Sequence, residues 1–369
     1  MIRALACALV LVACGGEVEP APTDPVPPPR RSAAQDQALR RMALDVAEAQ
    51  VCPLLLDRFL PLPEDGVVRA RDALPVVEGR LWVSACQATR RGDALGLHLE
   101  GRGWQRVERS AAGPLGSSFT VRGVVRFDAR LDVEGEIDLG YDPASRRASL
   151  VLTPRTAPRA RVTPIGAVPV SPDGGWSGII GGIGGLLGAS PASRAREVLE
   201  ARAAITVERE LARGATFQLD LCTGQLHGTL GALADGEAVP PPPWDDADTR
   251  FRENLRVRLR DGAFDLAGPF ESPLAIDVEV EEGEGVNVAV LCGPEGALHA
   301  SAYFSSGDAR YPDSPHRAGS FRRGRVGRLE VDGCPRAHVY FDPVDPRRVT
   351  TFRYRVRDDA EIEPLARCR

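Results

Sequence analysis

The residues of this chain that could do chemistry are its eight cysteines and five histidines, and their spacing does not indicate catalysis. No two cysteines form a C-x-x-C pair, so the spacing does not predict a zinc site or a thioredoxin-like redox site. The histidines stand singly, and the chain lacks the H-E-x-x-H, G-x-S-x-G, phosphate-loop and dinucleotide-binding patterns. We therefore expect no enzyme activity, no cofactor and no metal.

Composition excludes further classes of function. All 46 basic residues are arginine, which excludes a Schiff-base lysine and a phosphate-loop lysine. Net charge is −5 with both signs mixed along the chain, so the basic excess that nucleic-acid binding requires is missing. An apolar content of 43% is sufficient for folded cores in residues 32–369.

The first residues have the order of a secretory signal, with Arg3 followed by an apolar run from Ala4 to Val12. Leu11-Val12-Ala13-Cys14 resembles the bacterial lipobox, whose cysteine is diacylated and becomes the first residue of the mature chain. The resemblance implies a signal peptide at 1–13 and a membrane anchor on Cys14. The alternative is an ordinary signal peptide with an incidental cysteine. Gly15, where inner-membrane lipoproteins have Asp, implies the outer membrane, with the folded part in the periplasm or at the cell surface.

Residues 14–31 are predicted to be the lipid anchor and a proline-rich tether, because this composition favours extended chain and cannot bury a core. Once Cys7 is removed with the signal and Cys14 is acylated, six cysteines remain, and an even set in an exported chain indicates three disulfides. They are Cys52, Cys86, Cys222, Cys292, Cys334 and Cys368. Fifteen pairings are possible. We favour Cys52 with Cys86, Cys292 with Cys334, and Cys222 with Cys368.

The first folded segment is predicted to begin with a helix that Ser32 caps and that Pro53 ends or kinks. We expect its apolar stripe at Leu39, Met42, Val46 and Ala49. Alternating apolar residues then predict half-buried strands at 81–85 and 95–99.

From Phe119 to Tyr141 the odd positions are apolar or glycine and the even ones are nearly all charged or hydroxylic, with Val124 and Gly140 as the exceptions. This period of two predicts either one very long strand or a hairpin that turns at Glu134-Gly135 without loss of parity. A turn at 141–145 and a strand at 148–152 follow.

Residues 174–188 combine apolar side chains at helical spacing with many glycines, which implies close backbone approach or a flexible apolar loop. A helix is predicted from Ser190 to Gly214, with its main stripe at Ala195, Val198, Ala201, Ile205 and Ala212. Because this helix is apolar on more than one side, we expect the sheet to clasp it. A last strand is predicted at 217–221.

The order of helix, long meander, long helix and last strand, over roughly Ser32 to Thr229, resembles the tubular lipid-binding superfamily, which includes the bactericidal/permeability-increasing fold and the synaptotagmin-like mitochondrial lipid-binding domains. The resemblance rests on pattern rather than on a short motif. It implies a sheet wrapped around a helix and an apolar groove for acyl chains. The groove residues would be Phe119, Val121, Val125, Phe127, Leu131, Ile179, Ile183, Leu186 and Leu187. The same side chains could instead pack against one another as a dry core.

Residues 240–250 contain four successive prolines and are predicted to link a first domain at 32–239 to a second at 251–369. Short alternating segments separated by turn signals indicate about eight strands in the second domain and predict an antiparallel β-sandwich. The fold class expected for the whole chain is α+β: a long antiparallel meander wrapped around a long helix, followed by that sandwich.

Two functions fit these observations. The first is an anchored, exported lipoprotein that binds or carries a phospholipid or fatty acyl ligand in the groove of its first domain. The second is a non-enzymatic structural or protein-interaction lipoprotein of the cell envelope. Uptake of acyl lipid would distinguish them, whereas the sequence names neither the lipid, the protein partners nor the oligomeric state.

Overall fold

The computed structural model describes residues 32–63, 76–112, 118–142, 147–166, 170–172, 214–220, 226–230, 251–306 and 311–358, with helical residues between 196 and 212. Several sequence predictions fall outside the described residues. They concern Cys14 with the signal and tether, the linker 240–250, and Ile179, Ile183, Leu186, Leu187, Cys222 and Cys368.

The chain begins with helix α2 (Ala33–Leu55). The Ser32 side chain accepts a hydrogen bond from the backbone N–H of Gln35, and the Gln35 side chain accepts one from the backbone N–H of Ser32. This capping box satisfies two backbone donors at the start of the helix. Pro53 lies within the last turn, so the helix continues two residues beyond the predicted stop. The predicted stripe was wrong: Met42 and Val46 are half-buried and Ala49 is exposed. The buried face is made by Ala43, Leu44, Ala47 and Val51.

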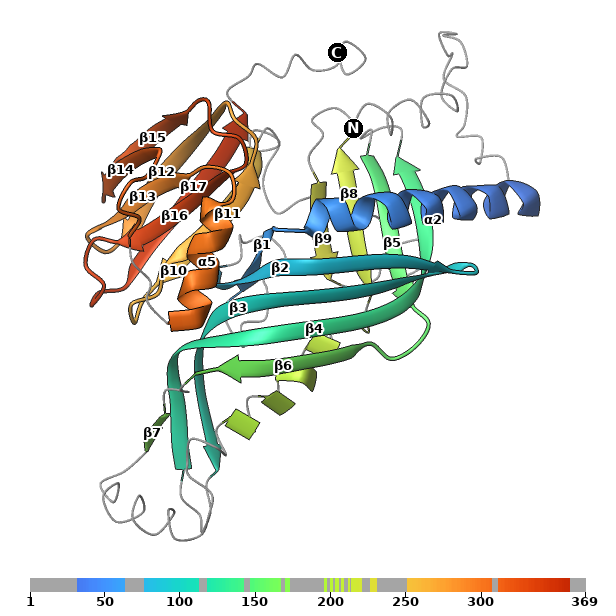
Figure 1. Ribbon diagram of the computed structural model, residues 1–369, viewed down its shortest axis with the longest axis horizontal. Helices are drawn as coiled ribbons and strands as arrows, with labels where there is room; N and C mark the ends of the chain where they lie inside the picture. The colour runs from blue at the N-terminus through green and yellow to red at the C-terminus, as the bar shows by residue number, and fades with distance from the viewer. Residues whose placement is uncertain are drawn as a thin grey trace, which may run out of the picture.

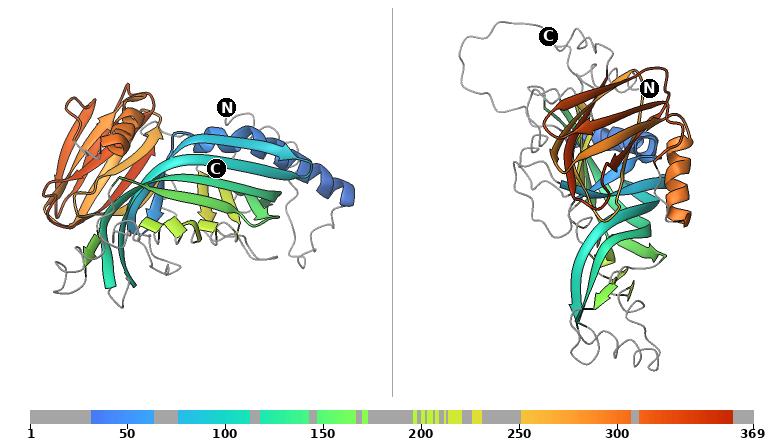
Figure 2. Two further views of the ribbon diagram at one scale, coloured as in Figure 1. Left: turned by 60° about the horizontal axis from the view of Figure 1, so that its bottom comes forward. Right: turned by 90° about the vertical axis from the view of Figure 1, so that its left-hand side faces the viewer.

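Long antiparallel strands follow: β1 (Phe59–Pro63), β2 (Val76–Arg91), β3 (Ala94–Ala112), β4 (Ser118–Asp142), β5 (Arg147–Pro154), β6 (Arg159–Ile165), β7 (Val170–Pro172), β8 (Ala215–Asp220) and β9 (Leu226–Leu230). Figure 1 shows β2, β3 and β4 as long, bent ribbons, with α2 lying across the sheet and projecting past it at its N-terminal end. Figure 2 shows the curvature of this sheet from another side.

Strand β4 decides between the two predictions for residues 119–141, because it is a single strand of 25 residues. One edge of β4 pairs with β3 from Ser118 to Gly135. Its other edge is shared by β7, β6 and β5 in turn. Glu134-Gly135 is therefore not a turn. A Cβ at Gly135 would lie 2.5 Å from the Thr153 carbonyl oxygen, so glycine is needed for the close approach of β5.

The remaining strands form a sandwich: β10 (Phe251–Leu259), β11 (Asp265–Phe270), β12 (Leu274–Glu282), β13 (Gly285–Leu291), β14 (Arg317–Arg322), β15 (Val326–Val331), β16 (Ala337–Pro343) and β17 (Thr350–Asp358). Sequence patterns did not predict β11, β14 or helix α5 (Glu295–Ser306). One sandwich sheet has the order β15-β12-β17-β10 and the other β11-β16-β13-β14. Their facing side chains form a dry core that includes Ile276, Val288 and Phe352.

The sandwich and the meander share one sheet. Strand β10 pairs in parallel with the start of β2, at Arg256 with Val76 and Val257 with Val77, which joins the strands into a single 13-stranded sheet among the described residues. Helix α5 fills the angle between the sandwich and strands β2–β4, as Figure 1 shows. The two parts are therefore connected by backbone hydrogen bonds as well as by the chain.

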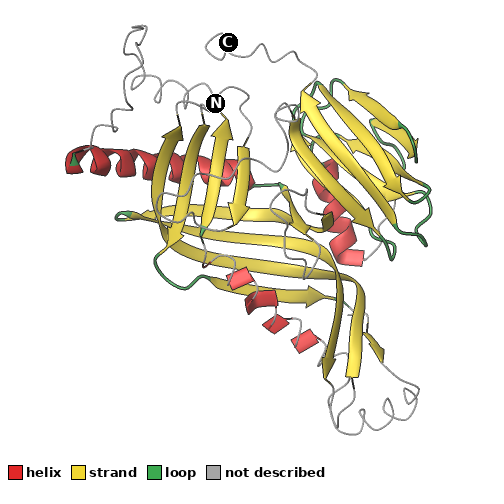
Figure 3. Ribbon diagram, turned by 180° about the vertical axis from the view of Figure 1, so that it is seen from behind, coloured by secondary structure: helices red, strands yellow, loops and turns green. Residues whose placement is uncertain are grey.

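The predicted α+β class was wrong, because the described protein is mainly β and is built on two sheets. No long helix is enclosed by the meander in the described part of the chain. Helix α2 covers one end of the sheet, and the helical residues between 196 and 212 run along β6 (Figure 3). Of the stripe predicted to face the sheet, Ala201 and Ala212 are exposed and Ile205 is 60% exposed.

This second helix protects a strand edge instead. The Glu208 carboxylate accepts a hydrogen bond from the Ala160 backbone N–H, and the Arg196 guanidinium donates one to the Pro164 carbonyl. These bonds occupy backbone groups on the edge of β6 that faces away from β4, which is one way in which proteins prevent edge-to-edge association.

Candidate functional site

The inner face of the meander, defined as the face on which α2 packs, is the candidate lipid-binding surface. It carries the odd residues of β4, and Val125, Ala129, Val133 and Ile137 are all buried there. The even residues between them, such as Asp128, Arg130 and Asp132, lie on the opposite or outer face. The alternation predicted for this stretch is thus present through the described side chains of β4.

Helix α2 fills one end of the inner face. Ala43, Leu44, Ala47 and Val51 pack there against apolar side chains from four strands, namely Leu95, Leu97, Val133, Ile137, Leu152 and Ala215. The disulfide between Cys52 and Cys86 joins the C-terminal end of α2 to β2. This end of the face is a dry core, the alternative that the sequence left open.

From the edge of this core, against which Leu99 packs, the apolar surface continues with half-buried side chains. Leu99 on β3 pairs with Leu131 on β4, and Phe127 pairs with Gly103. All three apolar residues are half-buried. On the other side of β4, Leu131, Ala129 and Phe127 pair with Ala160, Val162 and Pro164 of β6, which extends the apolar floor.

Two glycines flatten this floor. A Cβ at Gly103 would lie 2.4 Å from the Phe127 ring, and one at Gly101 would lie 3.0 Å from a Leu81 methyl and 2.5 Å from the Trp82 carbonyl oxygen. Glycine at both positions lets Phe127 and Leu81 lie across β3, so that the surface stays shallow and apolar.

The groove residues predicted from sequence have different outcomes. Val125 is buried, whereas Phe127 and Leu131 are half-buried on the inner face. Backbone pairing places Phe119 opposite Pro172 and Val121 opposite Val170. The side chains of Phe119 and Val121 are not among those that the structure describes. Leu99 was not among the groove residues predicted from sequence, although it shares the parity of Leu95 and Leu97, and that signal could have identified it.

The outer face has a different chemistry at each end. Far from the sandwich it carries cross-strand ion pairs, including Arg102 with Asp128 at 3.1 Å and His98 with Asp132 at 2.7 Å. The hydrogen bond with Asp132 raises the pKa of the half-exposed His98. The site is open to solvent, and His98 pairs there with Asp132 and Glu100 on the surface of the sheet.

At the sandwich end the outer face is covered by aromatic rings. Trp104 stacks on Phe264 with ring centroids 4.7 Å apart and donates its indole N–H to the Phe264 carbonyl at 3.2 Å. Rings of α5, Tyr303 and Phe304, lie within 5.9 Å of the Trp104 ring. Val124, one of the two exceptions to the polar pattern of β4, is packed against this cluster. The exception therefore marks where the second part of the protein docks.

A buried arginine crosses the same junction. The fully buried Arg80 of β2 forms a bidentate pair with Asp265 of β11, at 2.6 and 2.7 Å. Its remaining N–H groups donate to Phe59, Glu253 and Tyr354, so the guanidinium has an acceptor for each of its donors. Burial alone would lower the pKa of Arg80, but the attraction of Asp265, Tyr354 and Glu253 raises it well above the usual value.

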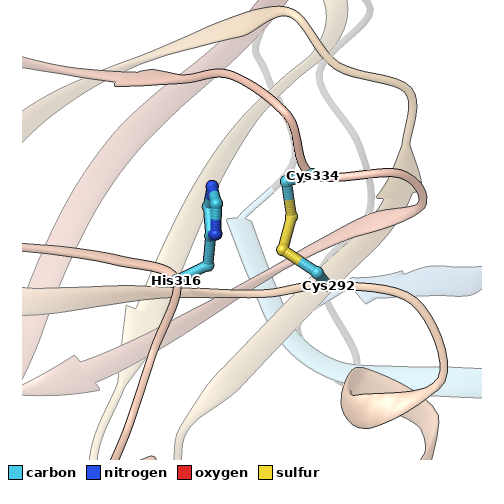
Figure 4. A group of neighbouring side chains, drawn as sticks. All are labelled: Cys292, His316 and Cys334. Atoms are coloured by element: carbon cyan, nitrogen blue, oxygen red, sulfur yellow. A yellow bond between two sulfur atoms is a disulfide. The ribbon is translucent and has the colours of Figure 1, made fainter.

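The structure contains two of the three disulfides that we favoured, Cys52–Cys86 and Cys292–Cys334. The second lies beside an imidazole, as Figure 4 shows, and the ligand atoms of Cys292, Cys334 and His316 all lie within 4.8 Å of one another. Sequence spacing did not reveal this group, because the three residues come from three separate loops.

No protein-family model matches the chain, and no curated protein matches it. Among solved structures, the chain is similar to one of Extended-Synaptotagmin 2 that comprises its SMP and C2 domains, with 9% identity and a TM-score of 0.19. The match covers 89% of this chain and 69% of that one. A likeness at this score does not establish a shared fold. No helix in the described part of the chain is long and apolar enough to cross a membrane.

Proposed function

We propose that this protein is a membrane-anchored, exported lipoprotein that binds an acyl chain of a phospholipid or fatty acid on the inner face of its meander, without catalysis. The observation that carries the proposal is the row of half-buried apolar side chains, Leu99, Phe127 and Leu131, that continues the dry core beyond α2. Contiguous apolar surface that a protein leaves uncovered marks ligand-binding grooves and interaction sites.

The shape of the surface also favours an acyl chain. Strands β3, β4 and β6 are paired side by side, so the apolar residues on their inner face form a continuous strip rather than an isolated spot. Covering such a strip with methylene groups gains about 0.8 kcal/mol for each group buried, which makes a long chain a suitable ligand.

The test measures uptake of a fluorescent fatty acid and of a fluorescent phospholipid by delipidated protein, and native mass spectrometry of the undelipidated protein. We expect one bound acyl ligand that denaturation releases. The variant Leu131→Asn should weaken probe binding about tenfold, since it removes roughly 1.4 kcal/mol of apolar contact.

The matched control is Arg130→Gln, which changes the neighbouring residue on the exposed outer face and should leave the affinity unchanged. If the protein takes up no probe and releases no lipid, the lipid-binding proposal is wrong. The structural or protein-interaction function of the cell envelope would then be the one to pursue.

Membrane anchoring and export are a separate part of the proposal. The lipobox-like Leu11-Val12-Ala13-Cys14 supports an anchor on Cys14, and two disulfides support an oxidising compartment. Cells fed labelled palmitate should incorporate the label into the wild-type protein and not into Cys14→Ala. Equal labelling of both proteins would exclude Cys14 as the anchor.

A further inference from the structure

Three loops of the sandwich bring two cysteines and a histidine together. Cys292 follows β13, His316 precedes β14, and Cys334 follows β15. Figure 4 shows the His316 ring beside the bond between the two sulfurs. The sulfur atoms and an imidazole nitrogen all lie within 4.8 Å of one another, a separation that a single metal ion can bridge after a small movement.

The loops are held in place by bonds that do not depend on the disulfide. The His316 backbone donates to the Val290 carbonyl at 2.8 Å, and the Gly293 backbone donates to the Pro335 carbonyl at 2.8 Å. The Cys334 backbone donates to the Ser272 hydroxyl at 3.0 Å. Breaking the bond between the sulfurs would therefore leave both cysteines next to His316.

The orientation of the imidazole is also set. His316 Nε2 lies 2.8 Å from the Asp332 carbonyl oxygen, which can only accept a hydrogen bond. Nε2 must then carry the proton, which leaves Nδ1 as the nitrogen with the lone pair in the neutral imidazole. A histidine that donates one ring nitrogen to a backbone carbonyl and offers the other is the usual arrangement of a histidine that binds a metal.

We propose that the reduced form of this site binds a thiophilic divalent cation, with Zn²⁺ as the best fit, through Cys292, Cys334 and His316. Two thiolates and one imidazole are a donor set that zinc accepts in tetrahedral sites, and a water molecule or a further ligand completes the fourth position. A cation also neutralises the thiolate of Cys334, which is fully buried and would be costly to charge alone.

The chemistry balances with a dithiol as the reductant. The dithiol transfers two electrons and two protons to the bond between Cys292 and Cys334, and its own sulfurs become a disulfide. Zn²⁺ then displaces one proton from each thiol and forms two zinc–sulfur bonds and one zinc–nitrogen bond. The oxidised form has no thiolates to offer, so the disulfide and the metal-bound state exclude one another.

The chain supplies its own control. Cys52 and Cys86 form the other described disulfide, and among the described residues no third metal ligand gathers around them. Reduction should open both bonds, whereas only the pair beside His316 should gain a tight metal site.

The experiment reduces the full-length protein with a dithiol, removes the reductant without air, and titrates first Co²⁺ and then Zn²⁺. We expect one equivalent of Co²⁺ with the visible bands of tetrahedral coordination and a sulfur-to-metal charge-transfer band, both lost when Zn²⁺ displaces it. Oxidised protein should show neither band. The C52S/C86S variant should bind as the wild type does, and the C292S/C334S variant should lose the site.

The His316→Ala variant keeps both cysteines and the disulfide, so it tests the site even if C292S/C334S does not fold. Its affinity for Zn²⁺ should fall by at least about tenfold. Reduced wild-type protein that binds no stoichiometric metal would overturn the proposal. So would an unchanged affinity in folded C292S/C334S, or an unchanged affinity in His316→Ala.

Discussion

The two faces of the long meander differ in a way that their composition does not suggest. The outer face carries most of the charges, yet at the sandwich end it is the more completely buried of the two, with Arg80 and Trp104 at 0% and 1% exposure. The inner face is apolar, yet beyond α2 some of its largest side chains, Phe127 and Leu131, are only half-buried. Hydropathy shows which side chains share a face, whereas the position of the other elements decides which face is covered.

The two faces also make different kinds of contact. The junction on the outer face is held by ion pairs and stacked rings, which are directional and specify one docking position. The inner face beyond α2 offers non-directional apolar surface, which tolerates ligands that differ in detail. The junction therefore fixes how the two parts dock, and the inner face is the surface on which the proposed acyl ligand would lie.

The largest expected effect is at the junction. Asp265→Ala removes the carboxylate that pairs with buried Arg80 and should lower the free energy of unfolding by about 3–5 kcal/mol, because it leaves a buried charge without its main partner. Urea unfolding measures the change. The double variant Arg80→Met with Asp265→Leu should recover much of the loss, since it removes the charge as well. A single variant as stable as the wild type would show that the pair does not hold the junction.

The next largest expected change is a loss of stability at low pH. Burial, with a further contribution from Arg336, lowers the pKa of His338 to about 4. In the unfolded chain this imidazole titrates near 6.5, so between pH 6.5 and 4 the unfolded state binds more protons and stability falls as the pH falls. We expect a loss of about 2–3 kcal/mol across this window. Unfolding measured at pH 7 and pH 4 should show a smaller loss in His338→Gln, and an equal loss would contradict the assignment.

A smaller effect is expected under α2. Gly135→Ala places a Cβ against the Thr153 carbonyl and a Leu152 methyl, so β5 must shift, at a cost of about 1–3 kcal/mol. Gly92→Ala tests a glycine with no atoms near the added Cβ but a positive φ of 67°, so any loss there comes from backbone strain alone. Thermal unfolding of the two variants compares crowding with strain. No loss in Gly135→Ala would mean that β4 and β5 are not closely packed at this point.

The smallest effect is at the open end of the outer face. Because Asp132 raises the pKa of His98, the pair stabilises the fold below pH 6.5, and this contribution is lost as the pH rises through the folded-state pKa. The pair is solvent-exposed, so we expect about 0.2–1 kcal/mol. A double-mutant cycle of His98→Asn and Asp132→Asn at pH 5.5 and pH 8.5 measures it. A coupling energy that is the same at both pH values would exclude the protonated pair.

Local patterns determined much of this protein. The cap at Ser32, the alternation of β4 and the core strands of the sandwich depend on neighbours in sequence, and each was predicted from such neighbours. Two disulfide pairings were also anticipated. The helix stripes at Val46 and Ile205 were assigned to the wrong sides, because a helix with apolar residues on several sides has no single preferred face until a partner is present.

Only the tertiary structure decided the rest. The pairing of β10 with β2, the bidentate contact of Arg80 with Asp265 across 185 positions, and the meeting of His316 with two cysteines depend on residues far apart in the chain. Sequence determines which side chains point the same way along an element, since that follows from backbone geometry. Which elements then meet depends on loop closure and packing, and these are properties of the whole chain.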